Sequence, residues 1–237
     1  MTRLALAAGM LAALIGCMLA PMAGGQVAGH AMVLATGVLA LVVLTAFARE
    51  ARRHTLLVKG IARLSRPGSI AGRSVALVPG LGAAFVGGLR APRIFWGDEL
   101  AGRLDDEEVH AVLLHERHHQ LARAPLRLVA VSALEPWLRH LETGRSWIEQ
   151  ERARVEIAAD AFALGAGATR PVLASALLKL SSSAQLGALP GFATAADLRI
   201  RALIGESTGL ESDRPASWGP AFAGVALVLA CVLLALR

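Results

Sequence analysis

Residues 104–120 read LDDEEVHAVLLHERHHQ, and this stretch decides how the rest of the chain is interpreted. It contains the pattern H-E-x-x-H, formed by His115, Glu116 and His119. On an α-helix, a spacing of four residues places two side chains on one face, about one turn apart. Two neutral imidazoles held in this way can bind one metal ion, and Glu116 can then take a proton from a metal-activated water. The alternative is a solvated, histidine-rich helix face.

The neighbouring residues favour a helix over this stretch. Asp105 is a candidate N-cap, and Glu108, three residues on, completes a capping box. The acidic side chains at 106–108 lie at the positive end of the helix dipole, and no proline or glycine follows until Pro125. The apolar run 112–114 leads directly into the first histidine, and a buried imidazole without a ligand would be costly to desolvate. These features favour a metal site over a solvated face.

The composition predicts an integral membrane protein. Hydrophobic residues make up 55% of the chain, and the mean hydropathy is +0.54. Three uncharged segments are each about long enough to span a bilayer: Leu4–Ala20, Ala28–Ala48 and Gly219–Leu236. We therefore expect about three transmembrane helices, two of them paired in an N-terminal hairpin. The first segment could instead be a signal peptide, with a lipoprotein-like cleavage site at Cys17.

Basic residues give the expected orientation in the membrane. Residues 49–66 contain six Arg and Lys residues and a single acidic residue, Glu50. By the positive-inside rule, the chain is expected to be a multi-pass protein of the cell (inner) membrane, with its middle region in the cytoplasm. The same basic residues, placed beside anionic lipid, explain the pI of about 10.8. No recognition motif supports a nucleic-acid partner. Cys17 and Cys231 both lie in apolar segments, so the metal ligands must be histidine and carboxylate.

These observations predict mainly α structure with a small β hairpin or sheet. The expected parts are a transmembrane hairpin (1–48), a basic juxtamembrane segment (49–73), a metal-binding domain (74–205), a linker (206–218) and a C-terminal transmembrane helix (219–237).

Two segments of the metal-binding domain are candidate strands. Ser74–Val78 is a short strand candidate, and Ala83–Trp96 suits an edge strand or hairpin. Such an edge could bind an extended peptide by strand addition, or it could simply be a structural hairpin that covers the helices.

A second helix carries the remaining candidate site residues. Ser146 and Glu149 suggest a capping box, and Gly165 suggests the end of the helix. Within it, Glu156 and Asp160 are four residues apart and share one face. Glu156 would complete a His2Glu site with one position open for water, and Asp160 could accept the free N–H of a ligand histidine.

H-E-x-x-H followed by E-x-x-x-D at 156–160 resembles the membrane-bound gluzincin metallopeptidases. That group includes the CAAX prenyl endopeptidases, the heat-shock protease HtpX and the transducer peptidases of the beta-lactamase regulator type. The resemblance covers Ser74–Leu203 and includes A-F-x-G at 84–87 and R-I-x-x-L at 199–203. In the transducer branch an Asp often stands where this chain has Ala124. This departure, and the absence of a large sensor, weaken any expectation of beta-lactam sensing.

The resemblance implies an integral-membrane zinc endopeptidase that hydrolyses peptide bonds of membrane or cytoplasmic regulatory proteins. One Zn²⁺ per chain would be held by His115, His119 and Glu156, with Glu116 as the general base. Because the chain has no tyrosine, Arg199 is the first candidate to stabilise the oxyanion, with a surface salt bridge as its alternative. Partners would be a protein or peptide substrate and the lipid bilayer. The alternative function is a catalytically silent, membrane-anchored signal transducer or scaffold. A zinc hydrolase of another kind is disfavoured.

Overall fold

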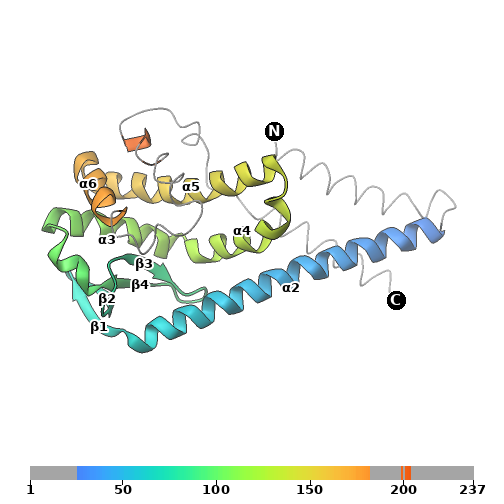
Figure 1. The fold of residues 1–237 in the computed structure, drawn as a ribbon, viewed down its shortest axis with the longest axis horizontal. Coiled ribbons are helices and arrows are strands. Elements are labelled where there is room, and N and C mark those ends of the chain that lie inside the picture. Colours follow the sequence, from blue (N-terminus) through green and yellow to red (C-terminus); the bar gives the residue numbers. More distant parts are fainter. Residues whose placement is uncertain (1–25, 182–198, 200, 204–237) are drawn as a thin grey trace. The chain divides into compact units, whose positions relative to one another are not determined.

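The computed structural model describes residues 26–181, 199 and 201–203 (Figure 1). The chain divides into two compact units, Met1–Ala46 with Asp213–Arg237, and Phe47–Ser212. The second unit contains the sheet and the H-E-x-x-H helix. From the first unit, the structure describes the N-terminal half of helix α2, Gln26–Leu64.

Helix α2 corrects the prediction of membrane spans. The apolar segment Ala28–Ala48 lies inside it, but the helix does not end there and continues through the charged residues from Arg49 onward. Among the residues that the structure describes, no helix combines the length and the apolar character needed to cross a bilayer. This finding overturns the predicted integral-membrane fold and, with it, the multi-pass inner-membrane location. The other two predicted spans, and both cysteines, lie outside the described residues.

The sheet has four strands in the order β1-β2-β4-β3. Their bounds are Arg66–Ile70 (β1), Arg73–Val78 (β2), Ala84–Gly87 (β3) and Arg93–Gly97 (β4). Two pairs of strands are antiparallel hairpins, β1–β2 and β3–β4, and the two hairpins join through the parallel pair β2–β4. The strand predicted at 74–78 and the hairpin predicted within 83–96 are both confirmed. The parallel contact between the hairpins makes the sheet mixed and leaves β3 at one edge.

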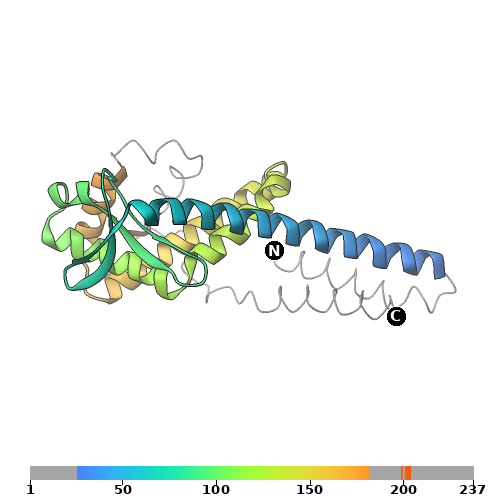
Figure 2. The same cartoon turned by 90° about the horizontal axis from the view of Figure 1, so that it is seen from below.

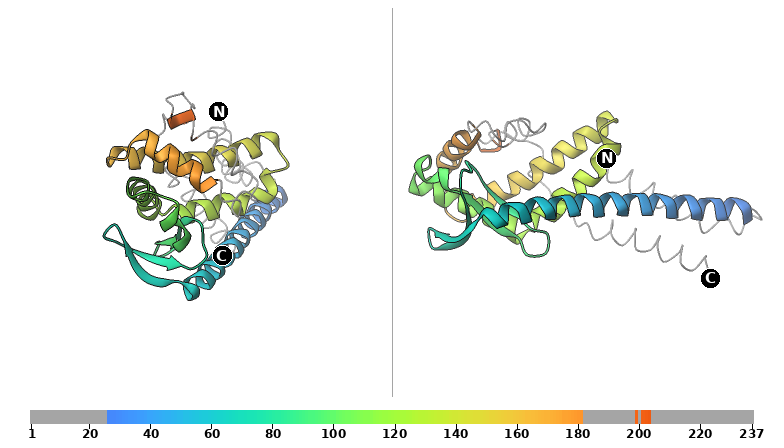
Figure 3. Two further views of the ribbon diagram at one scale, coloured as in Figure 1. Left: turned by 60° about the vertical axis from the view of Figure 1, so that its left-hand side comes forward. Right: turned by 60° about the horizontal axis from the view of Figure 1, so that its bottom comes forward.

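The helices that follow the sheet form two further layers. They are the 3₁₀ helix η1 (Asp98–Gly102) and the α-helices α3 (Asp106–Leu121), α4 (Ala124–Leu138), α5 (Glu142–Gly165) and α6 (Arg170–Ser181). Helices α3 and α4 lie against the sheet, while α5 and α6 cover their other side (Figures 1 and 3). The protein is thus mainly helical with a small mixed sheet. The C-terminal turns of α2 lead directly into β1 (Figure 2).

The ends of the central helices have local causes. At the start of α3, the Asp105 side chain accepts from the Glu108 backbone N–H, and the Glu108 side chain accepts from the Asp105 N–H, so the predicted capping box is confirmed. Arg123, with φ of 50°, separates α3 from α4. The predicted start of α5 at Ser146 is wrong, because the helix begins four residues earlier, at Glu142. Its predicted end at Gly165 is confirmed.

The core lies between the sheet and α3. Its largest buried side chains include Trp96 of β4, Leu100 of η1 and Leu113 of α3. The chain also passes very close to itself at Gly97, where a Cβ would lie 1.7 Å from the Leu81 carbonyl oxygen. Glycine is required there, and this tight contact fixes the end of β4 just before the chain turns towards α3.

Candidate metal centre

Helix α3 places the H-E-x-x-H side chains in the interior. His115, Glu116 and His119 are 6%, 7% and 7% exposed, because the helix is packed between the sheet on one side and α5 and α6 on the other. By contrast, His110 is exposed and His118 is half-buried. The burial rules out a solvated histidine-rich face, which was the alternative that the sequence left open. The motif instead contributes two imidazoles and one carboxyl group to a largely buried site.

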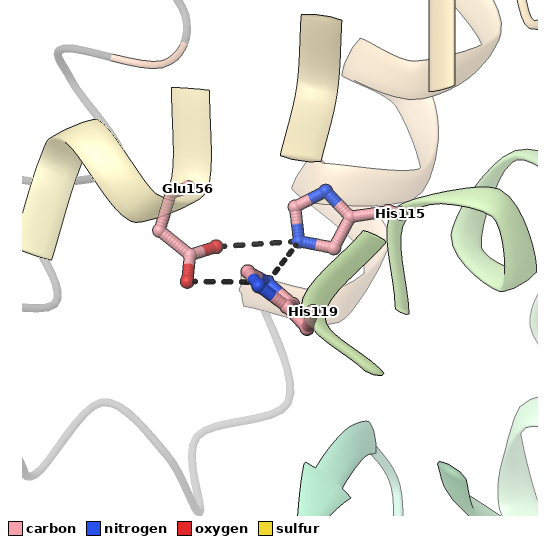
Figure 4. Close-up of side chains that lie close together, drawn as sticks. All are labelled: His115, His119 and Glu156. Atoms are coloured by element: carbon pink, nitrogen blue, oxygen red, sulfur yellow. Dashed lines mark hydrogen bonds and ion pairs between the residues drawn. The ribbon is translucent and has the colours of Figure 1, made fainter. Parts of the chain in front are cut away.

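Helix α5 brings Glu156 to the same point. The Nε2 atoms of His115 and His119 lie 3.0 Å apart. Glu156 faces both rings, with Oε2 at 3.3 Å from His115 Nε2 and Oε1 at 3.5 Å from His119 Nε2 (Figure 4). The three residues therefore point their ligand atoms at one small region, and together they could hold a metal ion.

The distances fit a tetrahedral metal. Metal–ligand bonds of about 2.0–2.1 Å place the ligand atoms of a tetrahedron about 3.4 Å apart. The two imidazole nitrogens are 3.0 Å apart, and each lies near a different oxygen of Glu156, at 3.3 Å from Oε2 and 3.5 Å from Oε1. These separations are close to the tetrahedral value, and one ligand atom from each of the three residues lies within 4.8 Å of the others. Two imidazole lone pairs at 3.0 Å repel each other unless a proton or a cation lies between them. Two histidines and one carboxylate also form a common ligand set for zinc.

The second carboxylate of α5, Asp160, orients the first histidine. Its Oδ1 lies 2.8 Å from His115 Nδ1. Asp160 as a whole is only 3% exposed. A proton on Nδ1 leaves Nε2 free to act as a metal ligand, so this contact selects the tautomer that a metal needs. Arg199 lies on the other side of Asp160 and donates to both of its oxygens, at 2.8 Å each. Of the six predicted site residues, all but Glu116 therefore form one connected network, whose members are His115, His119, Glu156, Asp160 and Arg199.

The charges of the site favour a positive ion. Burial alone lowers the pKa of His115, but its hydrogen bonds with Asp160 and Glu156 outweigh that effect and raise the pKa to about 9. Burial opposes ionisation of Glu156, but the two histidines and Arg199 hold its pKa well below the ordinary value. Three carboxylates, from Glu116, Glu156 and Asp160, thus share the region with a single guanidinium. With neutral histidines, one divalent cation would balance these charges.

Glu116 has the environment expected of a general base. Burial raises the pKa of its carboxyl group, the largest of several influences on it. Its Oε2 atom is buried and makes no hydrogen bond to the described residues, and the same holds for His119 Nδ1. A carboxylate oxygen that is desolvated and free beside two metal ligands is available to a reacting water.

One residue of the site region escaped the sequence analysis. Gln120, next to His119, donates from Nε2 to the Pro92 carbonyl oxygen at 2.8 Å, and its Oε1 accepts from Arg117 at 2.9 Å. It therefore ties the end of α3 to the loop between β3 and β4. The only signal in the sequence was its position directly after the motif, which does not reveal a partner 28 residues away.

Comparison with known proteins gave no match to any protein-family model, curated protein or solved structure. The resemblance to gluzincin peptidases therefore stays a prediction from short motifs. Function has to be argued from the geometry and chemistry of the site.

Proposed function

We propose that this protein is a zinc-dependent endopeptidase. The observation that carries the proposal is the convergence of His115, His119 and Glu156 on one point. Beside the histidines on α3, the buried Oε2 of Glu116 has no hydrogen-bond partner among the described residues. Zinc is the metal of choice because two imidazoles and one carboxylate are a common zinc ligand set that leaves a fourth position open, and these ligand atoms converge on one region. Such a site is typical of hydrolytic zinc enzymes rather than of structural zinc sites, in which protein side chains fill all four positions.

The chain's own residues would divide the chemistry as follows. When bound, zinc supplies Lewis acidity, which polarises a carbonyl group and acidifies water. Glu116 accepts a proton from the attacking water and returns it to the leaving amine, and its raised pKa suits both steps. Asp160 keeps His115 in the Nδ1–H tautomer. A general base of this kind needs a pKa above that of an ordinary carboxyl group, and burial raises the pKa of Glu116 in that direction.

Strand β3 supports an extended peptide as the substrate. It pairs with β4 on one side and with no other strand in the described part of the chain. It also contacts α3, which carries the two histidines. A strand edge on the element that contacts α3 could add a peptide as a further strand, and backbone hydrogen bonds would then hold the peptide next to the helix that carries the two histidines. Main-chain recognition of this kind predicts tolerance of different side chains.

The test is peptide hydrolysis by the purified full-length chain, loaded with zinc, against Glu116→Gln loaded in the same way. A mixture of unfolded protein substrates, with products identified by mass spectrometry, makes no assumption about sequence preference. We expect cleavage by the wild type, and loss of cleavage by a factor of at least about 100 in Glu116→Gln, with its zinc retained. Zinc-loaded wild type that cleaves nothing would favour the silent scaffold. Equal activity in the variant would show that the products come from a contaminating protease.

A further inference from the structure

The guanidinium of Arg199 contacts two carboxylates of helix α5, those of Asp160 and Glu156. Its Nε donates to Asp160 Oδ2 and its Nη2 to Asp160 Oδ1, both at 2.8 Å, which is a two-pronged ion pair. Its remaining nitrogen, Nη1, lies 3.2 Å from Glu156 Oε2. The side chain is only 12% exposed. One arginine thus joins the third metal ligand to the residue that orients the first.

The short helical segment around Arg199 is anchored in the core. Leu203, one turn further on, is 5% exposed and packs in an apolar cluster with residues of α3, α5 and α6. The members of this cluster are Ala111, Leu114, Ala163, Leu173 and Leu203. A buried leucine one helical turn from the arginine fixes the position from which the guanidinium reaches the site.

This geometry points to a role other than direct stabilisation of an oxyanion. A donor for an oxyanion must be aimed at the place where the negative charge develops. Here every guanidinium nitrogen already faces a carboxylate oxygen of Asp160 or Glu156. The planar fork of arginine suits this task, since it holds one carboxylate with two parallel bonds and still reaches a second.

We propose that Arg199 is a positioning residue that assembles the metal site. By gripping Asp160 it keeps that carboxylate on His115, and by contacting Glu156 it holds the third ligand towards the two imidazoles. The inference rests on the proposed zinc site but not on peptidase activity. The same geometry predicts that loss of Arg199 weakens zinc binding. A cation near a metal repels it, but Asp160 already neutralises Arg199 at contact distance, so loss of positioning outweighs relief of repulsion.

The experiment measures zinc affinity of the full-length chain by competition with a chromophoric chelator. The variants are Arg199→Gln, which removes the charge, and Arg199→Lys, which keeps the charge but not the fork. Arg139→Gln, at an exposed arginine at the end of α4, is the matched control. We expect both Arg199 variants to bind zinc about 10- to 100-fold more weakly than wild type, and Arg139→Gln to match wild type. Circular dichroism melting curves check that each variant is folded.

The absorption spectrum of the cobalt(II) form gives a second readout, one that reports ligand geometry without any activity. We expect both Arg199 variants to change this spectrum. Leu203→Ala should change it in the same direction and lower zinc affinity by a smaller factor, because the leucine affects the site through the packing that holds Arg199, α3 and α5 in place.

The following results would overturn the inference. Unchanged zinc affinity in Arg199→Gln, with loss of turnover at saturating zinc, would assign Arg199 to the oxyanion instead. Tighter zinc binding in Arg199→Gln would show that repulsion dominates. Full recovery by Arg199→Lys would show that charge alone matters. Failure of the wild type to bind zinc would refute both the proposed function and this inference, whereas normal binding in all variants would refute the inference alone.

Discussion

Zinc binding to this site should be coupled to the release of one proton. Hydrogen bonds with Asp160 and Glu156, working against burial, raise the pKa of His115 to about 9 in the metal-free chain. Its Nδ1 is occupied by Asp160, so the second proton sits on Nε2, the atom that faces His119 and Glu156. A metal must displace that proton, because only a neutral imidazole can be a ligand.

The size of the effect follows from the pKa of His115. At pH 7, two units below a pKa of about 9, roughly one molecule in a hundred has the neutral ring, so apparent zinc affinity is lowered about 100-fold, or about 2.7 kcal/mol. Raising the pH from 7 to 8 should tighten binding about tenfold, and the gain should level off above about pH 9. Calorimetry in buffers with different ionisation enthalpies should give about one proton released per zinc at pH 7.

A matched variant isolates the cause. Asp160→Asn keeps the size of the side chain but removes the negative charge beside His115 Nδ1. Its pH dependence should therefore shift to lower pH, and it should release less than one proton at pH 7. If wild-type affinity, corrected for the chelator's own protonation, is flat between pH 7 and 8.5, the assignment of a protonated His115 to the metal-free site is wrong.

Two predictions concern the scaffold around the site. Glu108→Gln should lower the free energy of unfolding by about 1–3 kcal/mol in urea titrations, because the buried carboxylate caps α3 and accepts from two side chains of α6. These partners, outweighing burial, hold the pKa of Glu108 below its ordinary value, so the wild type should lose this advantage as the pH falls below about 4.5. Gly97→Ala should cost at least about 2 kcal/mol, since the added methyl group would meet the Leu81 carbonyl oxygen. Gly102→Ala, where a Cβ meets nothing within 4 Å, is its control; equal melting temperatures for the two variants would refute the packing argument.

The parts of the site that sequence predicts well are those set by local spacing. Helix α3 begins where Asp105 and Glu108 form their capping box, and the four-residue spacing of its two histidines brings both rings to one point. The same spacing puts Glu156 and Asp160 on the face of α5 that meets α3. Local hydrogen bonds and helix periodicity are short-range properties, so a sequence reveals them directly.

The features that the sequence analysis did not predict depend on tertiary contacts. Helix α5 starts before the expected cap at Ser146, at Glu142, and its first turn lies against the end of α4, where a Cβ on Gly144 would be only 2.1 Å from the Leu138 carbonyl oxygen. The parallel pairing of β2 with β4 and the contact of Gln120 with Pro92 likewise join segments that no local pattern links.

The membrane prediction failed for a different reason. The hydropathy of a segment counts its apolar residues but does not by itself show that the folded helix can cross a bilayer. Ala28–Ala48 belongs to a longer helix that continues into charged sequence, and none of the described helices could cross a bilayer.

The most direct test of the account is the zinc content of the purified full-length chain, compared with that of Glu156→Ala. Elemental analysis after dialysis against buffer without chelator should give about one zinc per wild-type chain and little in the variant, because the variant keeps only two of the three ligands. Wild-type protein that is folded but binds no zinc would contradict the central claim. Equal zinc in both proteins would remove Glu156 from the ligand set and place the metal elsewhere.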